Sequence, residues 1–179
     1  ASGKLSDMME GGKVRKTEEE MDKILVQAQN FYQETAVQEG RGRFPGQDKY
    51  NMAVGGYTTE LALINDLENF EIFSDERGEN WCSIFGIAHE EAPMPSGALF
   101  VNDTIAAEDK CNACAETRFA GHDDWQYKFG GNALSSPFQD GHFIYVVIPG
   151  SGTGEDAEPP TLYIADAENP KFLNKILQF

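Results

Sequence analysis

The first long pattern in the chain is a narrow stripe of apolar residues with helical spacing. Within residues 11–39 these positions recur at intervals typical of one face of an α-helix. The following segment, GRGRFPG, cannot continue a helix, because glycine is too flexible and proline lacks an amide donor. We therefore predict one helix over about 14–38, ending near Glu39. Its packing face comprises Val14, Met21, Ile24, Leu25, Ala28, Phe31 and Tyr32.

The start of this helix has two interpretations. Thr17 and the three glutamates after it have the spacing of a capping box, in which a Thr side chain begins the helix. The same residues also suit an acidic first turn that follows a basic lead-in.

The rest of the chain alternates short apolar runs with turns. A glycine- and proline-rich passage over 40–57 predicts a structured loop, and 58–70 predicts a short helix with Thr58 or Thr59 as N-cap. The connections after it are too short or irregular for crossover helices, so the sheet should be mainly antiparallel and the class α+β. The predicted strands are 70–73, 82–87, 97–102, 141–149 and 161–166.

Two segments complete the predicted fold. Residues 149–160 are rich in Gly, Pro and acids, which indicates a mobile exposed loop. Asn169 and Pro170 are typical of a helix start, and the apolar residues after them suit one helical face. We therefore expect a short C-terminal helix that carries Phe172, Leu173, Ile176 and Leu177.

Composition and charge limit the possible partners. A chain of 179 residues with a hydrophobic fraction of 40% suits a single domain over 1–179. Its 30 acidic residues against 14 basic ones give a formal charge of -16, which disfavours nucleic acid and anionic lipids. No window resembles a bilayer span or a signal peptide. The opening helix is compatible with a processed or truncated chain that lacks a hydrophobic N-terminal segment.

The opening segment resembles a known family. The line KLSDMMEGGKVRKTEEEMDKILVQAQNFYQE resembles the exit of the N-terminal helix of type IV pilins and type II secretion pseudopilins. The turn GRGRFPG resembles the G-R-[YF]-P turn that often follows that helix. The similarity covers about a quarter of the chain and lacks the cleavage-site segment with its Phe and Glu. In this family the helix continues into a hydrophobic half, and its amphipathic half packs on an antiparallel sheet.

The resemblance implies a structural subunit of an extracytoplasmic pilus or pseudopilus-like fibre. Such a subunit is membrane-anchored before assembly, here only through the missing N-terminal segment. Its partners would be other pilin-like subunits, and it would not be an enzyme.

Three cysteines offer a second line of interpretation. Cys111 and Cys114 form a Cys-x-x-Cys pair, but neighbouring acids and the absence of a βαβ pattern disfavour redox catalysis. Zinc could be held by Cys111, Cys114, His122 and either Cys82 or His89. In an extracytoplasmic protein, a disulfide from Cys82 to Cys111 or Cys114 is the structural alternative.

The segment GHDDWQYKFGGN contains a candidate calcium site. His122, Asp123 and Asp124 lie together there, and carboxylate oxygens suit calcium, although EF-hand spacing is not met. Some pseudopilins have a calcium site in a C-terminal loop, whereas a solvated turn is the simpler interpretation. The alternation of Trp125, Tyr127 and Phe129 predicts one face of a strand.

No residue pattern indicates an active site. The chain has no phosphate-binding Gly-Lys-Ser/Thr loop, and Ser135 and Ser136 lack the setting of a nucleophile elbow. The alternative to a fibre subunit is a cell-envelope binding or sensor module, stabilised by a metal at Cys111, Cys114 and His122. A thiol enzyme would explain only the CNAC motif.

Overall fold

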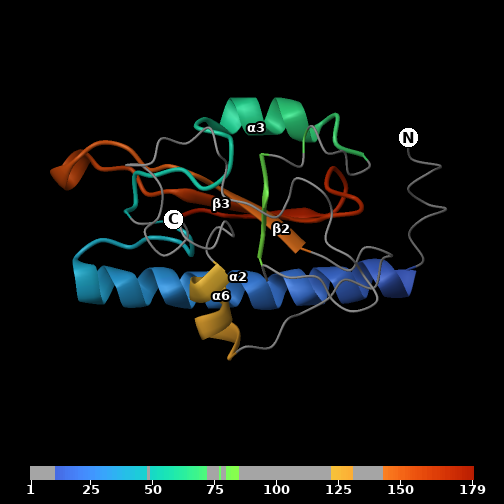
Figure 1. The fold of residues 1–179 in the computed structure, drawn as a ribbon, viewed down its shortest axis with the longest axis horizontal. Helices are drawn as coiled ribbons and strands as arrows, with labels where there is room; N and C mark the ends of the chain where they lie inside the picture. Colours follow the sequence, from blue (N-terminus) through green and yellow to red (C-terminus); the bar gives the residue numbers. More distant parts are fainter. Residues whose placement is uncertain (1–10, 48, 72–76, 78–79, 85–121, 131–142) are drawn as a thin grey trace.

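The structure is a computed structural model of the chain and combines helices with one antiparallel sheet, which confirms the α+β class (Figure 1). It describes residues 11–47, 49–71, 77, 80–84, 122–130 and 143–179. The described elements, in chain order, are α2 (Gly11–Glu39), α3 (Glu60–Leu67), β1 (Cys82–Ser83), α6 (His122–Phe129), β2 (Phe143–Ile148), the 3-10 turn η2 (Gly154–Asp156), β3 (Thr161–Asp166) and β4 (Asn174–Leu177).

Helix α2 confirms the predicted long amphipathic helix. Its stripe is buried at Met21, Ile24, Ala28 and Phe31, while Val14, Leu25 and Tyr32 are half-buried. Polar members of the same stripe, which the apolar pattern did not reveal, are Thr17, Glu20 and Thr35.

The prediction for the start of α2 is wrong in one respect, and the prediction for its end is confirmed. The capping role of Thr17 is wrong, because its side chain is buried within the helix and donates to the Lys13 carbonyl at 2.8 Å. At the other end the Gly40 amide donates to the Ala36 carbonyl at 3.0 Å, with a left-handed φ of +84° at Gly40. Glycine adopts that conformation without strain, so the helix ends at Glu39 as predicted.

The sheet has the strand order β1-β2-β3-β4, and every neighbouring pair is antiparallel. The run at 161–166 is confirmed as β3, and the runs at 141–149 and 82–87 contain β2 and β1. Phe70 and Glu71 lie outside any strand, so that prediction is wrong for these two residues. The predicted strand at 97–102 lies outside the described residues.

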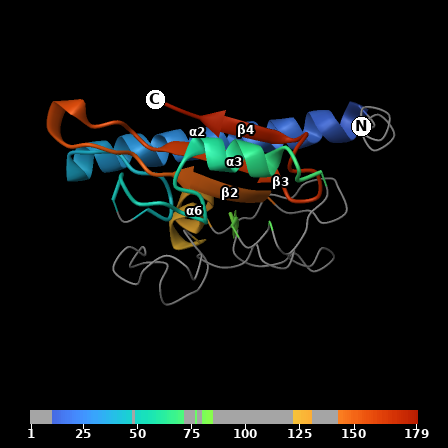
Figure 2. The same ribbon diagram turned by 90° about the horizontal axis from the view of Figure 1, so that it is seen from above.

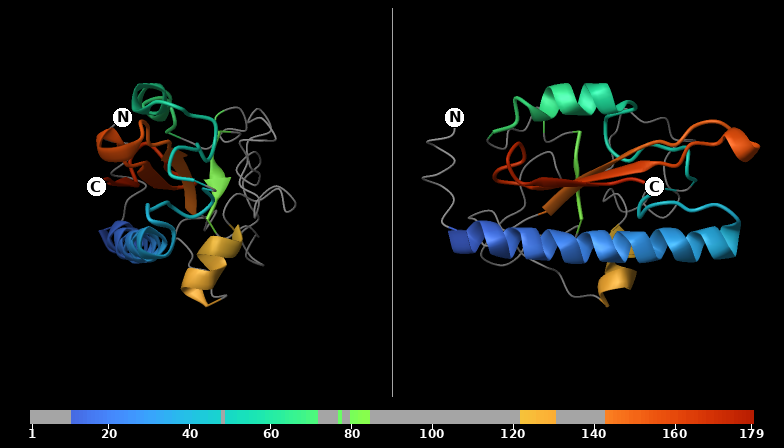
Figure 3. Two further views of the ribbon diagram at one scale, coloured as in Figure 1. Left: turned by 90° about the vertical axis from the view of Figure 1, so that its left-hand side faces the viewer. Right: turned by 180° about the vertical axis from the view of Figure 1, so that it is seen from behind.

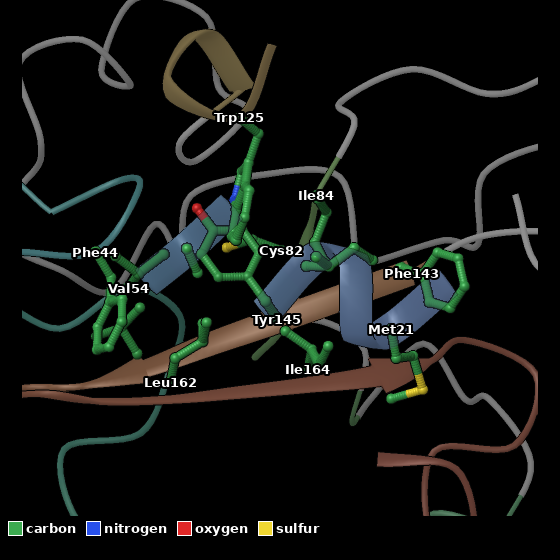
Figure 4. Packing of buried hydrophobic residues seen from close by; sticks show 13 residues of the cluster. Met21, Phe44, Val54, Cys82, Ile84, Trp125, Phe143, Tyr145, Leu162 and Ile164 are labelled. Atoms are coloured by element: carbon green, nitrogen blue, oxygen red, sulfur yellow. The ribbon is translucent and has the colours of Figure 1, made fainter. Parts of the chain in front are cut away.

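Two layers of side chains cover the sheet. Helix α2 runs along one face, in roughly the same direction as the strands, and α3 lies over the other face (Figures 1, 2 and 3). Strands β2 and β3 are buried throughout, since alternate residues point to opposite faces. The α2-side cluster includes Tyr145, Ile164 and Trp125, seen from close by in Figure 4. The α3-side cluster includes Leu63, Trp81 and Tyr163.

The C-terminal segment forms a strand, so the predicted C-terminal helix is wrong. Asp166 instead closes a turn, because its Oδ1 accepts from the amides of Glu168 and Asn169 at 2.9 and 3.0 Å. The chain then reverses, and β4 pairs with β3, placing Leu177 opposite Leu162. Backbone bonds to β3 therefore replace the bonds that a helix would have made.

The aromatic run after His122 is also not the predicted strand. It belongs to helix α6, where Trp125 is buried and Phe129 partly buried one turn later, while Tyr127 is 69% exposed. Residues four apart share a helical face, so Trp125 and Phe129 pack inward together. Their ring centroids lie 6.4 Å apart.

Candidate functional site

The turn that follows α2, residues 40–47, is a compact structure held by side chains of the helix itself. The Thr35 hydroxyl accepts the Arg43 amide at 3.0 Å and donates to the Phe31 carbonyl at 3.0 Å. At Gly42 an added Cβ would lie 2.4 Å from the Tyr32 ring. Thr35 and Gly42 therefore bring the turn back against the last turns of the helix.

Arg43 links this turn to its surroundings. Its Nε donates to Glu39 at 3.0 Å, its Nη1 donates to the Gln47 carbonyl at 2.8 Å, and its guanidinium lies over the Phe31 ring. A planar guanidinium can satisfy several acceptors at once, which a lysine could not do with the same geometry. The arginine of the resemblance motif thus has a structural role in ending α2.

Gln47 fixes the remainder of the turn and is almost completely buried. Its Oε1 accepts the Phe44 amide at 2.8 Å, and its Nε2 donates to the carbonyls of Tyr50 and Met52 at 2.9 and 2.7 Å. Phe44 is buried in the α2-side cluster. The predicted structured loop is therefore confirmed over the described part of 40–57, with Val54 bridging to Val147 in β2.

A cavity of about 220 Å³ lies beside this turn, and cations dominate its lining. Arg41 lies over the Tyr50 ring, with its guanidinium carbon 4.7 Å from the ring centroid. Lys49 is exposed, whereas Arg43 is held by Glu39 as described above. We call this the cationic cavity; it is lined by Glu39, Arg41, Arg43, Lys49, Tyr50 and Asn51.

The hairpin between β2 and β3 contacts two of the residues that line the cationic cavity. The Arg41 Nη2 donates to the Gly154 carbonyl at 3.3 Å, and the Tyr50 hydroxyl donates to the Gly152 carbonyl. The hairpin is mostly exposed, as predicted for 149–160, but Ser151 and Glu158 form a β-bridge within it. Turn and hairpin are therefore in contact, at the end of the molecule where α2 ends (Figure 1).

A second cavity, of about 300 Å³, lies between the start of α3 and the end of the chain. Its lining includes Glu60, whose carboxylate accepts from Tyr163 at 3.2 Å, Thr161 at 3.3 Å and Gln178 at 3.1 Å. Burial, and then the Glu60 charge, raise the pKa of Tyr163 to about 12. Glu60 thus serves as an acceptor that joins α3 to β3.

The candidate metal ligands are only partly within the described residues. Asp124 accepts the Gly46 amide at 3.0 Å and lies 3.7 Å from the Arg43 guanidinium, so its carboxylate supports the turn. Cys111, Cys114 and His89 lie outside the described residues, as do the side chains of His122 and Asp123. Calcium or zinc binding by this set remains a prediction.

Cys82 is the one cysteine that the described part of the chain contains. It is buried in the α2-side cluster (Figure 4), and burial raises the pKa of its thiol to about 12. The predicted disulfide from Cys82 involves Cys111 or Cys114, which are not described, so it remains a prediction. A thiol with so high a pKa is a poor nucleophile at neutral pH.

No group of three or more His, Cys, Asp or Glu side chains within the described residues is placed to hold a metal ion. No helix in the described part is both long and apolar enough to cross a membrane.

Comparisons with protein families, with curated proteins and with solved structures found no match to this chain.

Proposed function

We propose that this chain is a structural subunit of an extracytoplasmic fibre of the type IV pilus or pseudopilus kind. The observation that supports this most is the length and one-sided packing of α2. Its 29 residues span about 43 Å at a rise of about 1.5 Å per residue, roughly twice the length of a six-residue strand. A helix of this length on a small sheet is the arrangement that the resemblance implies.

The free face of α2 offers further support. Val26 is 53% exposed and Val37 is 87% exposed, so both leave apolar surface uncovered in the isolated chain. Burial of such surface favours association, whereas the net charge of -16 opposes the close approach of copies. Contacts between subunits in a fibre would cover these side chains.

The turn after α2 supports the same proposal in a different way. The residues that resemble the pilin turn are those that end the helix and connect it to the sheet, through Gly40, Gly42 and Arg43. A subunit whose helix must bear contacts with its neighbours needs a firm connection between helix and domain. The Thr35, Arg43 and Gln47 hydrogen bonds supply one.

The test is to locate the natively encoded chain in its own cells. Antibodies raised against the purified domain should label filaments that are sheared from the cell surface and examined by electron microscopy. Val37→Asp should reduce incorporation into filaments without changing the thermal midpoint of the domain. Gln38→Asp is the matched control, because it adds the same charge at a neighbouring exposed position.

Two outcomes would contradict the proposal. The first is an encoded sequence that begins with an ordinary signal peptide cleaved immediately before Ala1, since the mature chain would then lack a fibre-core helix. The second is recovery of the native protein only as a dispersed monomer, with no labelled filaments under conditions in which it is expressed.

A further inference from the structure

Unpaired charges of opposite sign lie beside each other at one end of the molecule. Arg41 and Lys49 line the cationic cavity, and neither forms an ion pair with a described residue. The hairpin tip next to it carries Glu155, Asp156 and Glu158, whose carboxylates also have no ion pair within the described part of the chain. Figures 1 and 3 show the end of α2 and the η2 turn at the same end of the molecule.

Within one copy these two sets of charges lie near each other but form no ion pair among the described residues. Arg41 donates to a backbone oxygen of the hairpin, that of Gly154, and its guanidinium carbon lies 4.7 Å from the centroid of the Tyr50 ring. The hairpin is thus attached through its main chain, while its tip residues remain exposed. Arg41 has five N–H donors, of which this contact uses one, so the others are available to another acceptor.

The lining of the cationic cavity has a local charge opposite to that of the chain. Among the described lining residues Glu39 is the one acid, and its carboxylate is engaged by Arg43 at 3.0 Å. The described lining has three basic residues against this one acid, which is a net positive charge, in a chain whose formal charge is -16. Asp48, next to Lys49 in sequence, lies outside the described residues.

We propose that the cationic cavity binds the carboxylates of the hairpin tip of a second copy of this chain. Charge complementarity favours this occupant, because the tip presents three carboxylates within four residues on an exposed turn. Cavity and tip adjoin on every copy, so the same contact can be repeated from one neighbour to the next. Arg41 and Lys49 would each receive a carboxylate, with Arg41 already oriented by Tyr50.

The biological role of this contact rests on the proposed fibre. Exposed ion pairs are individually weak, so this contact by itself forms between free molecules only when one of them is present in large excess, as a peptide can be in a titration. In a fibre, neighbouring copies are already held close together by another contact, so each has a high effective concentration relative to the next. A weak contact between them then forms readily and selects their relative orientation. The net negative charge of the chain makes such a local attraction useful, because the copies otherwise repel each other.

The experiment is a titration that needs no filaments. A synthetic peptide of residues 149–160 is added to the isotopically labelled purified chain, and amide chemical shifts are followed by nuclear magnetic resonance. Saturable shifts are expected at Lys49, Tyr50 and Asn51. A peptide in which Glu155, Asp156 and Glu158 are replaced by Gln, Asn and Gln should lose them.

Variants of the chain test the cavity itself. Lys49→Gln, which leaves the Arg41 contact with the hairpin intact, should weaken peptide binding severalfold, and Arg41→Gln with Lys49→Gln should abolish it. Arg15→Gln is the matched control, since Arg15 is an exposed cation on α2 away from the cavity. Thermal unfolding of each variant checks that the fold is retained.

The proposal is overturned by any of three results. Equal shifts from the uncharged peptide would show that carboxylates are not recognised. Unchanged binding by Lys49→Gln and by the double variant would place the contact elsewhere. Binding of inorganic phosphate as tightly as the peptide would identify a site for a free anion. None of these results bears on whether the chain is found in filaments, so this inference and the proposed function can fail separately.

Discussion

The two faces of the sheet are both buried, but they are covered by different means. On one face a helix of 29 residues, α2, supplies Met21, Ile24 and Ala28 along its length, and α6 and the turn after α2 add to the same cluster. On the other face α3 has eight residues, and Tyr57, Phe70 and Trp81 from outside regular elements complete the cover. One face is therefore covered mainly by one long helix, and the other by several short pieces.

Polar contacts are present on both sides. On the α3 side Glu60 accepts from Tyr163 at 3.2 Å, and on the α2 side Glu34 accepts from Lys128 of α6 at 2.7 Å. The two sides differ in their apolar contacts, because the stripe of α2 is buried at points along most of its length, whereas within α3 only Leu63 is buried. The α2 side should therefore be the less adaptable of the two.

The largest expected effect is on the α2 side. Ile24→Ala should lower the free energy of unfolding by an amount in the upper part of the range of about 2–5 kcal/mol, since the long helix cannot move to fill the cavity. Urea denaturation followed by circular dichroism measures it. Val26→Ala, at a position that is 53% exposed on the same helix, should change stability by less than about 0.5 kcal/mol. Equal midpoints for the two variants would show that α2 is not docked.

A smaller effect is expected for the equivalent change on the α3 side. Leu63 is fully buried, yet Leu63→Ala should fall in the lower part of the same range of about 2–5 kcal/mol, because α3 is short and can shift inward. The control is Leu61→Ala, at a position that is 69% exposed. A loss for Leu63→Ala equal to or larger than that for Ile24→Ala would contradict the proposed difference in adaptability.

The connection of α2 to the sheet can be tested with two glycines. Gly42→Ala should destabilise the domain by about 1–3 kcal/mol, because the new methyl group meets a Tyr32 ring that is stacked on Phe179. Gly12→Ala meets no atom within 4 Å and lies in the helix, so it should instead stabilise by about 0.5–1 kcal/mol. Thermal midpoints that move in the same direction for both would contradict the close packing at Gly42.

The smallest effect concerns pH on the α3 side. The pKa of Tyr163 is raised from 10.0 to about 12, so between these values the folded chain holds a proton that the unfolded chain has lost. The free energy of unfolding should therefore decrease as pH rises through this window. Tyr163→Phe should make the decrease shallower, as measured by urea denaturation at about pH 9 and about pH 11.

Tyr127→Phe serves as the control for Tyr163→Phe, since Tyr127 is 69% exposed and lies on α6. It should leave the dependence on pH unchanged. A Tyr163→Phe variant whose stability falls as steeply as that of the parent chain would show that the buried hydroxyl near Glu60 does not cause the slope. Tyr57, whose pKa is also raised by burial and then by Asp66, accounts for part of the remaining slope.

The candidate site was only partly predictable. The sequence indicated a structured turn after α2, because glycine and proline exclude a helix there. It did not indicate the cationic cavity, whose shape depends on contacts from Arg41 to Gly154 and from Tyr50 to Gly152, each more than 100 residues apart. The hydrogen bonds of Thr35 and Gln47 were likewise not predictable, because neither a polar residue on an apolar helical stripe nor one in a turn indicates its partner in the sequence.

The amino-acid sequence was sufficient to predict the α+β class, the stripe and the C-terminal end of α2, and strands β2 and β3. In these segments a single periodicity or an unbroken apolar run favours one conformation over most of the length of the element. The conformations of β4 and α6 depend instead on contacts with distant residues, because the apolar residues of these segments suit either a helix or a strand. Pairing with β3 made 174–177 a strand, and burial of Trp125 with Phe129 favoured a helix over 122–129. Intrinsic preferences of less than about 1 kcal/mol per residue are smaller than these nonlocal contacts.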